Sequence, residues 1–158
     1  MDKSRPTLND LPKLPLESIL TERSVLAVGN DIVEVPRIRS LLAQSSERFM
    51  KRCFTSGEIR DCQGKAHPAV HFAGRWAAKE AVFKALKLQW DRAFSWKEIE
   101  ICGGPDHSPG VLLSREIRSG YPENQVPDIL LSISHCDEYA FAIALAVGRG
   151  TSQSRVKR

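Results

Sequence analysis

Apolar residues along the chain form short runs whose patterns are typical of strands. Runs rich in β-branched or alternating apolar residues predict strands over 25–33, 98–102, 111–113, 129–134 and 139–147. Only the segment 135–138 separates the last two runs, so they predict a hairpin. None of the runs approaches the roughly 18 apolar residues of a membrane-spanning helix, and no such helix is expected.

One long segment has the period of a helix instead. Pro68 suits the first turn of a helix that extends to about residue 86. Small residues recur along it at helical spacing: Ala73, Ala77, Ala81 and Ala85. Such a face lets another backbone approach closely, either within one subunit or between subunits. Trp76, Glu80 and Lys84 follow one another on a second face.

Shorter helices are predicted around the long one. They cover residues 36–42, 47–52, 59–63 and 114–119. Pro36 suits the first turn of the first of these helices, and Thr55 and Glu58 have the spacing of a capping box before the third. Because strands and helices are mixed without strict alternation, the predicted fold class is α+β, with an antiparallel sheet packed against one long helix and shorter helices.

The size of the chain corresponds to one ordinary domain. It has 158 residues, of which 42% are hydrophobic, and this is enough for one core. We expect a partly ordered N-terminal arm over 1–24, a folded domain over 25–147 and a flexible tail over 148–158. The arm contains acidic residues, in which transit peptides are poor, so it is not a clear transit peptide.

Charge and cysteine content exclude several classes of function. The net charge of +4 fits an acidic partner or a phosphate-rich substrate. A stripe of aromatic and basic residues is missing, so we expect no nucleic-acid partner. No Cys-x-x-Cys pair or zinc-finger histidine spacing occurs, so zinc is not expected. We interpret four cysteines as reduced, small core residues of an intracellular protein: Cys53, Cys62, Cys102 and Cys136.

Three elements carry residues suited to phosphate chemistry: Asp31 in the first strand; Arg75, Lys79, Glu80 and Lys84 in the long helix; and Ser134 and His135 at the end of a later strand. Taken singly, each has an ordinary explanation as a turn residue, a solvated i,i+4 ion pair or a turn histidine. Taken together, two carboxylates on different elements can hold Mg²⁺, and the cations can bind a polyphosphate.

These residues lie in motifs that resemble those of the holo-acyl-carrier-protein synthases, the compact type of the 4′-phosphopantetheinyl transferase superfamily. The motifs are Gly-x-Asp-Ile-Val-Glu from Gly29, Arg-Phe from Arg48, Phe-Ala-x-Arg-Trp-Ala-Ala-Lys-Glu-Ala-x-x-Lys-Ala from Phe72, and Ser-Ile-Ser-His from Ser132 followed by a Tyr-Ala strand. They occur in the family's order over about residues 26–146. The element W-x-x-K-E-A-x-x-K is the signature of the wider superfamily.

The resemblance implies the phosphopantetheinyl transferase fold and an activity. The enzyme would move 4′-phosphopantetheine from coenzyme A to a serine of an apo acyl carrier protein, with Mg²⁺ as cofactor and Mn²⁺ as an alternative ion. The carrier would serve fatty-acid or polyketide synthesis. The resemblance also implies a homotrimer with active sites at subunit interfaces, and no membrane partner.

The resemblance further implies residue roles. Asp31 and Glu80 would bind the metal, and Glu80 and Lys84 would be catalytic, with the general base left open between Glu80 and a water molecule. Coenzyme A would contact Arg75, Lys79, Lys84, Ser134 and His135. The acidic carrier protein would dock on Arg37, Arg48, Phe49 and Arg52.

The sequence also departs from the family pattern. The bacterial glycine-rich turn after Lys84 is replaced by residues 85–92, which contain no glycine, and Gly104-Pro105 or Pro109-Gly110 stands where many members have Gly-Lys-Pro. These differences favour a eukaryotic or otherwise divergent member, one option being mitochondrial fatty-acid synthesis. Two other functions stay open: a non-catalytic module that binds coenzyme A or a carrier protein, and a different Mg²⁺-dependent nucleotide enzyme, although no P-loop is present.

Overall fold

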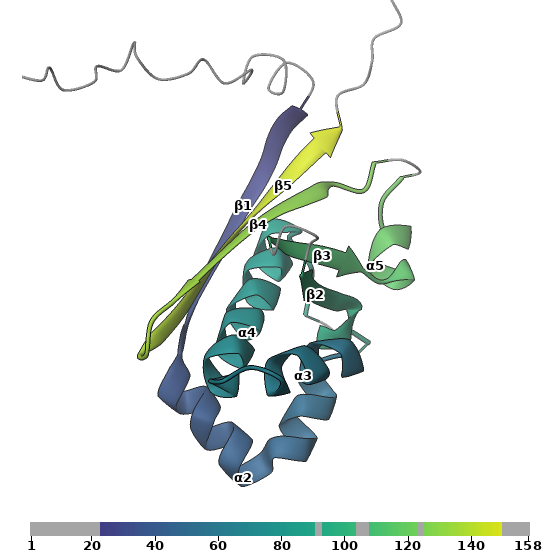
Figure 1. Cartoon of the computed structure of the whole chain (residues 1–158). Helices are drawn as coiled ribbons and strands as arrows, with labels where there is room; N and C mark the ends of the chain where they lie inside the picture. The colour runs from purple at the N-terminus through teal and green to yellow at the C-terminus, as the bar shows by residue number, and fades with distance from the viewer. Residues whose placement is uncertain (1–22, 91–92, 104–107, 123–124, 150–158) are drawn as a thin grey trace, which may run out of the picture.

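The structure is built on a three-stranded antiparallel sheet (Figure 1). The computed structural model describes residues 23–90, 93–103, 108–122 and 125–149. The sheet contains β1 (Arg23–Glu34), β5 (Tyr139–Arg149) and β4 (Asp128–His135) in the order β1-β5-β4. β4 and β5 form the predicted hairpin. The N-terminal arm, apart from the start of β1 at Arg23, and the end of the predicted tail lie outside the described residues.

The long helix α4 (Pro68–Ala85) packs against one face of this sheet. The four alanines of its predicted small-residue face are buried, and alternate residues of β5 are buried alanines as well: Ala140, Ala142, Ala144 and Ala146. Gly29 of β1 lies so close to α4 that an added Cβ would be 2.1 Å from the carbonyl oxygen of Ala81. Small residues on both sides therefore bring the helix and strand backbones together, inside one subunit.

The remaining elements surround α4. They are α2 (Val35–Cys53), α3 (Ser56–Gln63), the short 3-10 helix η2 (Trp96–Glu98), the hairpin of β2 (Ile99–Gly103) and β3 (Pro109–Leu113), and α5 (Arg115–Ser119). The predicted capping box is present, since Glu58 N donates to Thr55 Oγ1 and Thr55 N donates to Glu58 Oε2. The α+β fold class predicted from the sequence is confirmed.

The prediction of two separate helices over 36–42 and 47–52 is wrong. Both belong to α2, which Figure 1 shows as one ribbon that bends near its middle. The segment between them contains neither proline nor glycine, so nothing in its sequence ends the helix. Among the helices that the structure describes, none is long and apolar enough to cross a bilayer.

The face of the sheet that points away from α4 is apolar and exposed. Large side chains with exposed fractions between 36% and 63% alternate with the buried residues: Val28, Ile32, Leu130, Phe141 and Ile143. A contiguous apolar sheet face of this kind is typical of a surface that another protein chain covers.

Candidate active site

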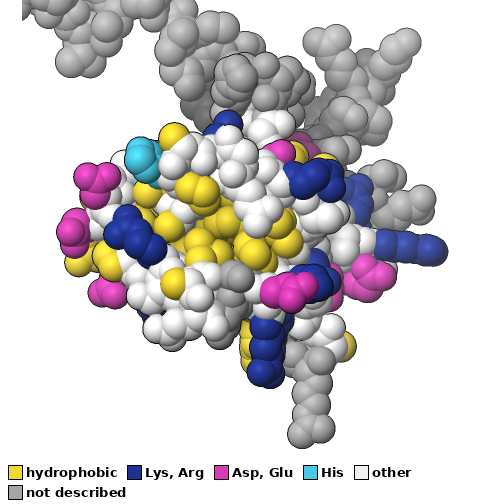
Figure 2. All heavy atoms as spheres, turned by 60° about the horizontal axis from the view of Figure 1, so that its bottom comes forward, with side chains coloured by type: hydrophobic (Ala, Val, Ile, Leu, Met, Phe, Trp, Pro, Cys, Tyr) yellow, Lys and Arg dark blue, Asp and Glu magenta, His cyan; other side chains and the backbone are white. Residues whose placement is uncertain are grey.

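A cavity of about 560 Å³ lies where β1 passes into α2. Asp31 and Glu34 come from the end of β1, Arg37 and Phe49 from α2, and Glu80 from α4. Glu80 reaches this cavity because it follows Trp76, another lining residue, by one helical turn. Seen from the end where α2 lies, the molecule has apolar side chains gathered in a hollow with charged side chains at its rim (Figure 2).

The two predicted metal ligands carry a local excess of negative charge. Burial raises the pKa of Glu80, the nearby charge of Asp31 raises it further, and Lys84 opposes both effects. Lys84 Nζ lies 2.8 Å from Asp31 Oδ1 and donates to the carbonyl oxygen of Asn30 at 3.0 Å. Lys84, which follows Glu80 by one helical turn, thus pairs with Asp31.

These residues fit a Mg²⁺ ion by their chemistry. The negative charges of Asp31 and Glu80 repel each other, and a divalent cation between them would remove this repulsion. Mg²⁺ also prefers oxygen ligands. No cluster of three or more acidic, histidine or cysteine ligands occurs in the part of the chain that the structure describes. Protein ligands limited to Asp31 and Glu80 would leave coordination positions for water and phosphate oxygens.

Lys79 lies elsewhere, although it precedes Glu80. Its side chain is completely buried, and its Nζ lies 2.9 Å from Glu58 Oε2. It also donates to the carbonyl oxygens of Trp96 and Ile99. All three ammonium hydrogens therefore have partners inside the protein. In this arrangement Lys79 exposes no atom to coenzyme A, so the structure does not bring this predicted contact to the site.

Glu58 completes this buried network. Its Oε1 accepts a hydrogen bond from the backbone of Ile101, and its Oε2 accepts one from the backbone of Thr55. Burial lowers the pKa of Lys79, and the Glu58 carboxylate counteracts that effect. The ion pair consequently ties the start of α3, α4, η2 and β2 together.

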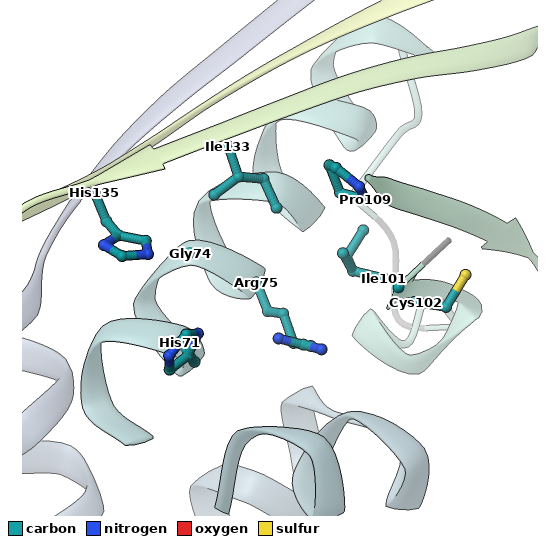
Figure 3. A pocket seen from close by; sticks show the side chains of 9 residues that line it. His71, Gly74, Arg75, Ile101, Cys102, Pro109, Ile133 and His135 are labelled. Atoms are coloured by element: carbon teal, nitrogen blue, oxygen red, sulfur yellow. The ribbon is translucent and has the colours of Figure 1, made fainter. Parts of the chain in front are cut away.

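A second cavity, of about 220 Å³, opens on the other side of α4. Figure 3 shows His135, from the end of β4, pointing toward His71 and Arg75 of α4. Ile101, Pro109 and Ile133 give this cavity an apolar wall. Its lining shares no residue with the first cavity: from α4 it takes His71, Gly74 and Arg75, whereas the first cavity takes Trp76 and Glu80.

The guanidinium of Arg75 has an ion-pair partner, but not all of its hydrogen-bond donors are used. Its Nη2 lies 3.4 Å from Asp61 Oδ2, whereas its Nε is buried without a hydrogen-bond partner. A buried unpaired donor of a guanidinium is costly. Of the predicted coenzyme A contacts, Arg75 and His135 therefore share one cavity.

Ser134 faces away from this cavity. Ile133 approaches Gly74 of α4, with 3.2 Å between its Cγ2 and a Cβ built on the glycine, so the next residue along β4 points to the opposite, exposed face of the sheet. The carrier-docking residues also divide. Arg37 and Phe49 line the first cavity, while Arg48 and Arg52 are exposed on α2 and do not line it.

The prediction that the four cysteines are buried core residues is confirmed for only two of them. Cys53 and Cys62 are buried, and burial raises the pKa of each thiol to about 11. Cys102 is partly exposed and lines the second cavity, and Cys136 is exposed in the β4–β5 turn. All four are free thiols.

The turn after Lys84 forms without glycine. Lys87 adopts a left-handed backbone with φ of 53°, a conformation usual for glycine, and Leu88 N donates to the carbonyl oxygen of Phe83. Pro109 and Gly110 belong to β3, whereas Gly104 and Pro105 lie outside the described residues. Pro109, His71, Trp76 and Tyr139 line the cavities, and sequence reasoning did not assign any of them a site role.

Comparisons with known proteins identify the class. The sequence profile of the 4′-phosphopantetheinyl transferase superfamily matches residues 27–144, and the chain belongs to this family. It is 40% identical over 120 residues to a holo-[acyl-carrier-protein] synthase of Protochlamydia amoebophila, an alignment that covers 76% of this chain and 96% of the relative. The corresponding enzyme of Chlamydia pneumoniae is 41% identical over 123 residues, with 78% and 98% covered.

Solved structures of the same class of enzyme resemble this chain in fold. The Helicobacter pylori holo-[acyl-carrier-protein] synthase in complex with coenzyme A has a TM-score of 0.66 and 30% identity, with 75% of this chain and 98% of that chain covered. The holo-ACP-synthase of Plasmodium yoelii has a TM-score of 0.67 and 28% identity, with 81% and 98% covered. These comparisons confirm the resemblance. The mitochondrial option gains no support from the bacterial relatives.

The buried ion pair generates a prediction about stability. Lys79→Met should lower the free energy of unfolding by about 3–5 kcal/mol, because Glu58 would stay buried without its counter-charge. Adding Glu58→Gln should recover part of this loss, since a neutral amide is less costly to bury. Urea unfolding followed by circular dichroism measures both effects. Lys51→Met, which breaks an exposed pair with Glu47, is the control and should cause no measurable change. Equal stability of the Lys79 and Lys51 variants would contradict the prediction.

Proposed function

We propose that this chain transfers 4′-phosphopantetheine from coenzyme A to a serine of an apo acyl carrier protein of fatty-acid synthesis. The single observation that carries the proposal is the cluster of Asp31, Glu80 and Lys84 beside a cavity, in a chain of this family. The relatives named holo-[acyl-carrier-protein] synthase support the same reaction. The thiol substrate and the free cysteines fit an intracellular enzyme.

The chemistry is a displacement at phosphorus. The serine hydroxyl oxygen attacks the β-phosphorus of coenzyme A, and the bond from that phosphorus to the bridging oxygen breaks. The products are the phosphopantetheinyl serine and adenosine 3′,5′-bisphosphate, with the serine proton passing to a base. Asp31 and Glu80 would hold Mg²⁺ or Mn²⁺, which when bound supplies charge neutralisation for the pyrophosphate. Lys84, already beside Asp31, would donate to the leaving oxygens.

The second cavity suits the nucleotide end of coenzyme A. Arg75 and His135 line it and supply donors for phosphate. The wall of Ile101, Pro109 and Ile133 offers an apolar surface for a base. Ser134 is not part of this lining, so its contact with coenzyme A would have to come from the exposed face of the sheet.

The positions of the two cavities support a ring of three subunits. Asp31 lies on β1 and His135 on β4, which are opposite edges of the sheet. One coenzyme A molecule can use both halves if the β1 edge of one subunit meets the β4 edge of the next. Such a head-to-tail interface closes into a ring of three when the rotation between neighbouring subunits is about 120°.

One prediction of this proposal concerns the reaction itself. Mass spectrometry of an apo acyl carrier protein, incubated with coenzyme A, Mg²⁺ and this protein, should show the gain of one phosphopantetheine. Asp31→Ala and Glu80→Ala should each nearly abolish the transfer, because several kcal/mol of charge stabilisation leave with the ion. Binding of coenzyme A without any transfer by the native protein would indicate a non-catalytic binding module. Near-normal turnover of either variant at limiting Mg²⁺ would refute its role as a ligand.

A second prediction tests the shared site. The test uses two variants: one carries Asp31→Ala, and the other carries both Arg75→Ala and His135→Ala. Each variant should be nearly inactive alone. Every ring that mixes them contains one interface of three with both halves intact, so purified mixed rings should regain about a third of the native activity. Co-expression with two affinity tags, followed by a transfer assay, measures this. Mixed rings that isolate intact but stay inactive would show that one subunit supplies the whole site.

A third prediction concerns the carrier-docking surface. Arg37 lies at the first cavity and Arg48 is exposed on the same helix, so both could meet an acidic carrier. Arg37→Glu or Arg48→Glu should raise the KM for the carrier far more than that for coenzyme A, because charges at an interface rim act mainly on association. Added salt should slow the native enzyme more than the variants. KM titrations of each substrate at two ionic strengths measure this; an unchanged carrier KM in both variants would place docking elsewhere.

A further inference from the structure

His71 is a histidine of the second cavity that the reaction described above does not use. It lies one turn before Arg75 on α4 and lines the same cavity. Its ring lies edge-on to that of His135, with 5.7 Å between ring centroids and an angle of 74° between the ring planes (Figure 3). The two imidazoles and the guanidinium of Arg75 thus converge on one small volume.

The charges around His71 are almost all positive. Lys65 and His67 approach from the connection before α4, Arg75 from the same helix and His135 from β4. Asp61 of α3 is paired with the Nη2 of Arg75. Among the described residues that line the cavity none carries a carboxylate, and β2 and β3 contribute only the Cys102 thiol as a titratable group. The surroundings of the cavity therefore carry more positive than negative charge, with Asp61 as the carboxylate paired to Arg75.

We propose that His71 is a further phosphate-binding residue and that it takes up a proton when a nucleotide phosphate enters the cavity. The proposal rests on the function proposed above, because that function supplies the ligand: the adenosine 3′,5′-bisphosphate half of coenzyme A. It goes beyond that function in making binding of the nucleotide end dependent on proton concentration, through a residue on α4.

The direction of this linkage follows from the surroundings. In the free protein, burial and then the charge of His135 lower the pKa of His71, so the neutral ring is favoured near neutral pH. A phosphate dianion reverses the sign of the local potential and favours the charged ring. The pKa of His71 is then higher in the complex than in the free protein. Affinity for the phosphate must increase as pH falls through the pKa of the complex, and the gain is complete below the pKa of the free protein.

Calorimetric titration with adenosine 3′,5′-bisphosphate tests this in the intact protein. At pH 7, the binding enthalpy measured in two buffers of different ionisation enthalpy gives the number of protons taken up. His71→Asn should reduce that number and should weaken binding about tenfold at pH 6, where a charge-assisted hydrogen bond is lost. At pH 8 the same variant should bind nearly as well as the native protein.

His67→Asn is the matched control, because His67 is exposed and lines a different cavity. His67 is the smallest of the charge effects on His71, so the proton uptake of this variant should stay close to that of the native protein, and the proton equilibria of the ligand are common to all variants. Unchanged proton uptake in His71→Asn would overturn the proposal, as would an equal loss of affinity at pH 6 and pH 8. Either result leaves the transferase function intact if the carrier still gains phosphopantetheine. Failure of that transfer assay would instead refute the proposed function.

Discussion

The close approach of α4 to the sheet sets the distances on which the candidate site depends. Gly29 leaves no room for a side chain against the backbone of α4, and alanines occupy the helix and strand positions around it. Asp31 lies two residues beyond Gly29, and Glu80 adjoins Ala81, whose carbonyl oxygen Gly29 approaches. The smallest side chains of the protein thereby allow two carboxylates from separate elements to lie near each other. Larger residues at this contact would separate them before any metal could bind.

The buried pair of Lys79 and Glu58 fixes the rotation of α4 about its own axis. A helix packed through alanines alone presents a smooth surface that resists rotation weakly, whereas a buried charge pair tolerates few arrangements. With Lys79 held toward η2 and β2, the neighbouring side chains have fixed directions: Glu80 and Trp76 toward the first cavity, and Arg75 toward the second. The same pair fixes β2, whose Ile101 forms part of the apolar wall. Its effect on the site is therefore one of positioning.

Sequence patterns predicted the strands, the long helix and the capping box, because these depend on local periodicity and on hydrogen bonds between near neighbours. The motifs also identified Asp31, Glu80 and Lys84, which the structure brings together. Patterns failed where the outcome depends on long-range contacts. The position of Lys79 next to Glu80 suggested a phosphate contact, but its partners, Glu58 and the carbonyl oxygens of Trp96 and Ile99, are distant in sequence. The role of His71 in a cavity could not be foreseen, since only the fold places it opposite His135.

Lys84 resolves an electrostatic conflict that the site creates in the absence of a divalent ion. Asp31 and Glu80 raise each other's electrostatic free energy, yet both must stay ionised to bind a cation. The ammonium group of Lys84, 2.8 Å from Asp31, compensates part of that charge in the free protein. Because half of the Lys84 side chain is exposed, it can turn from the carboxylate to a phosphate oxygen at small cost in burial. The same lysine can therefore stabilise the carboxylates in the free protein and then donate to a phosphate oxygen when the substrate is bound.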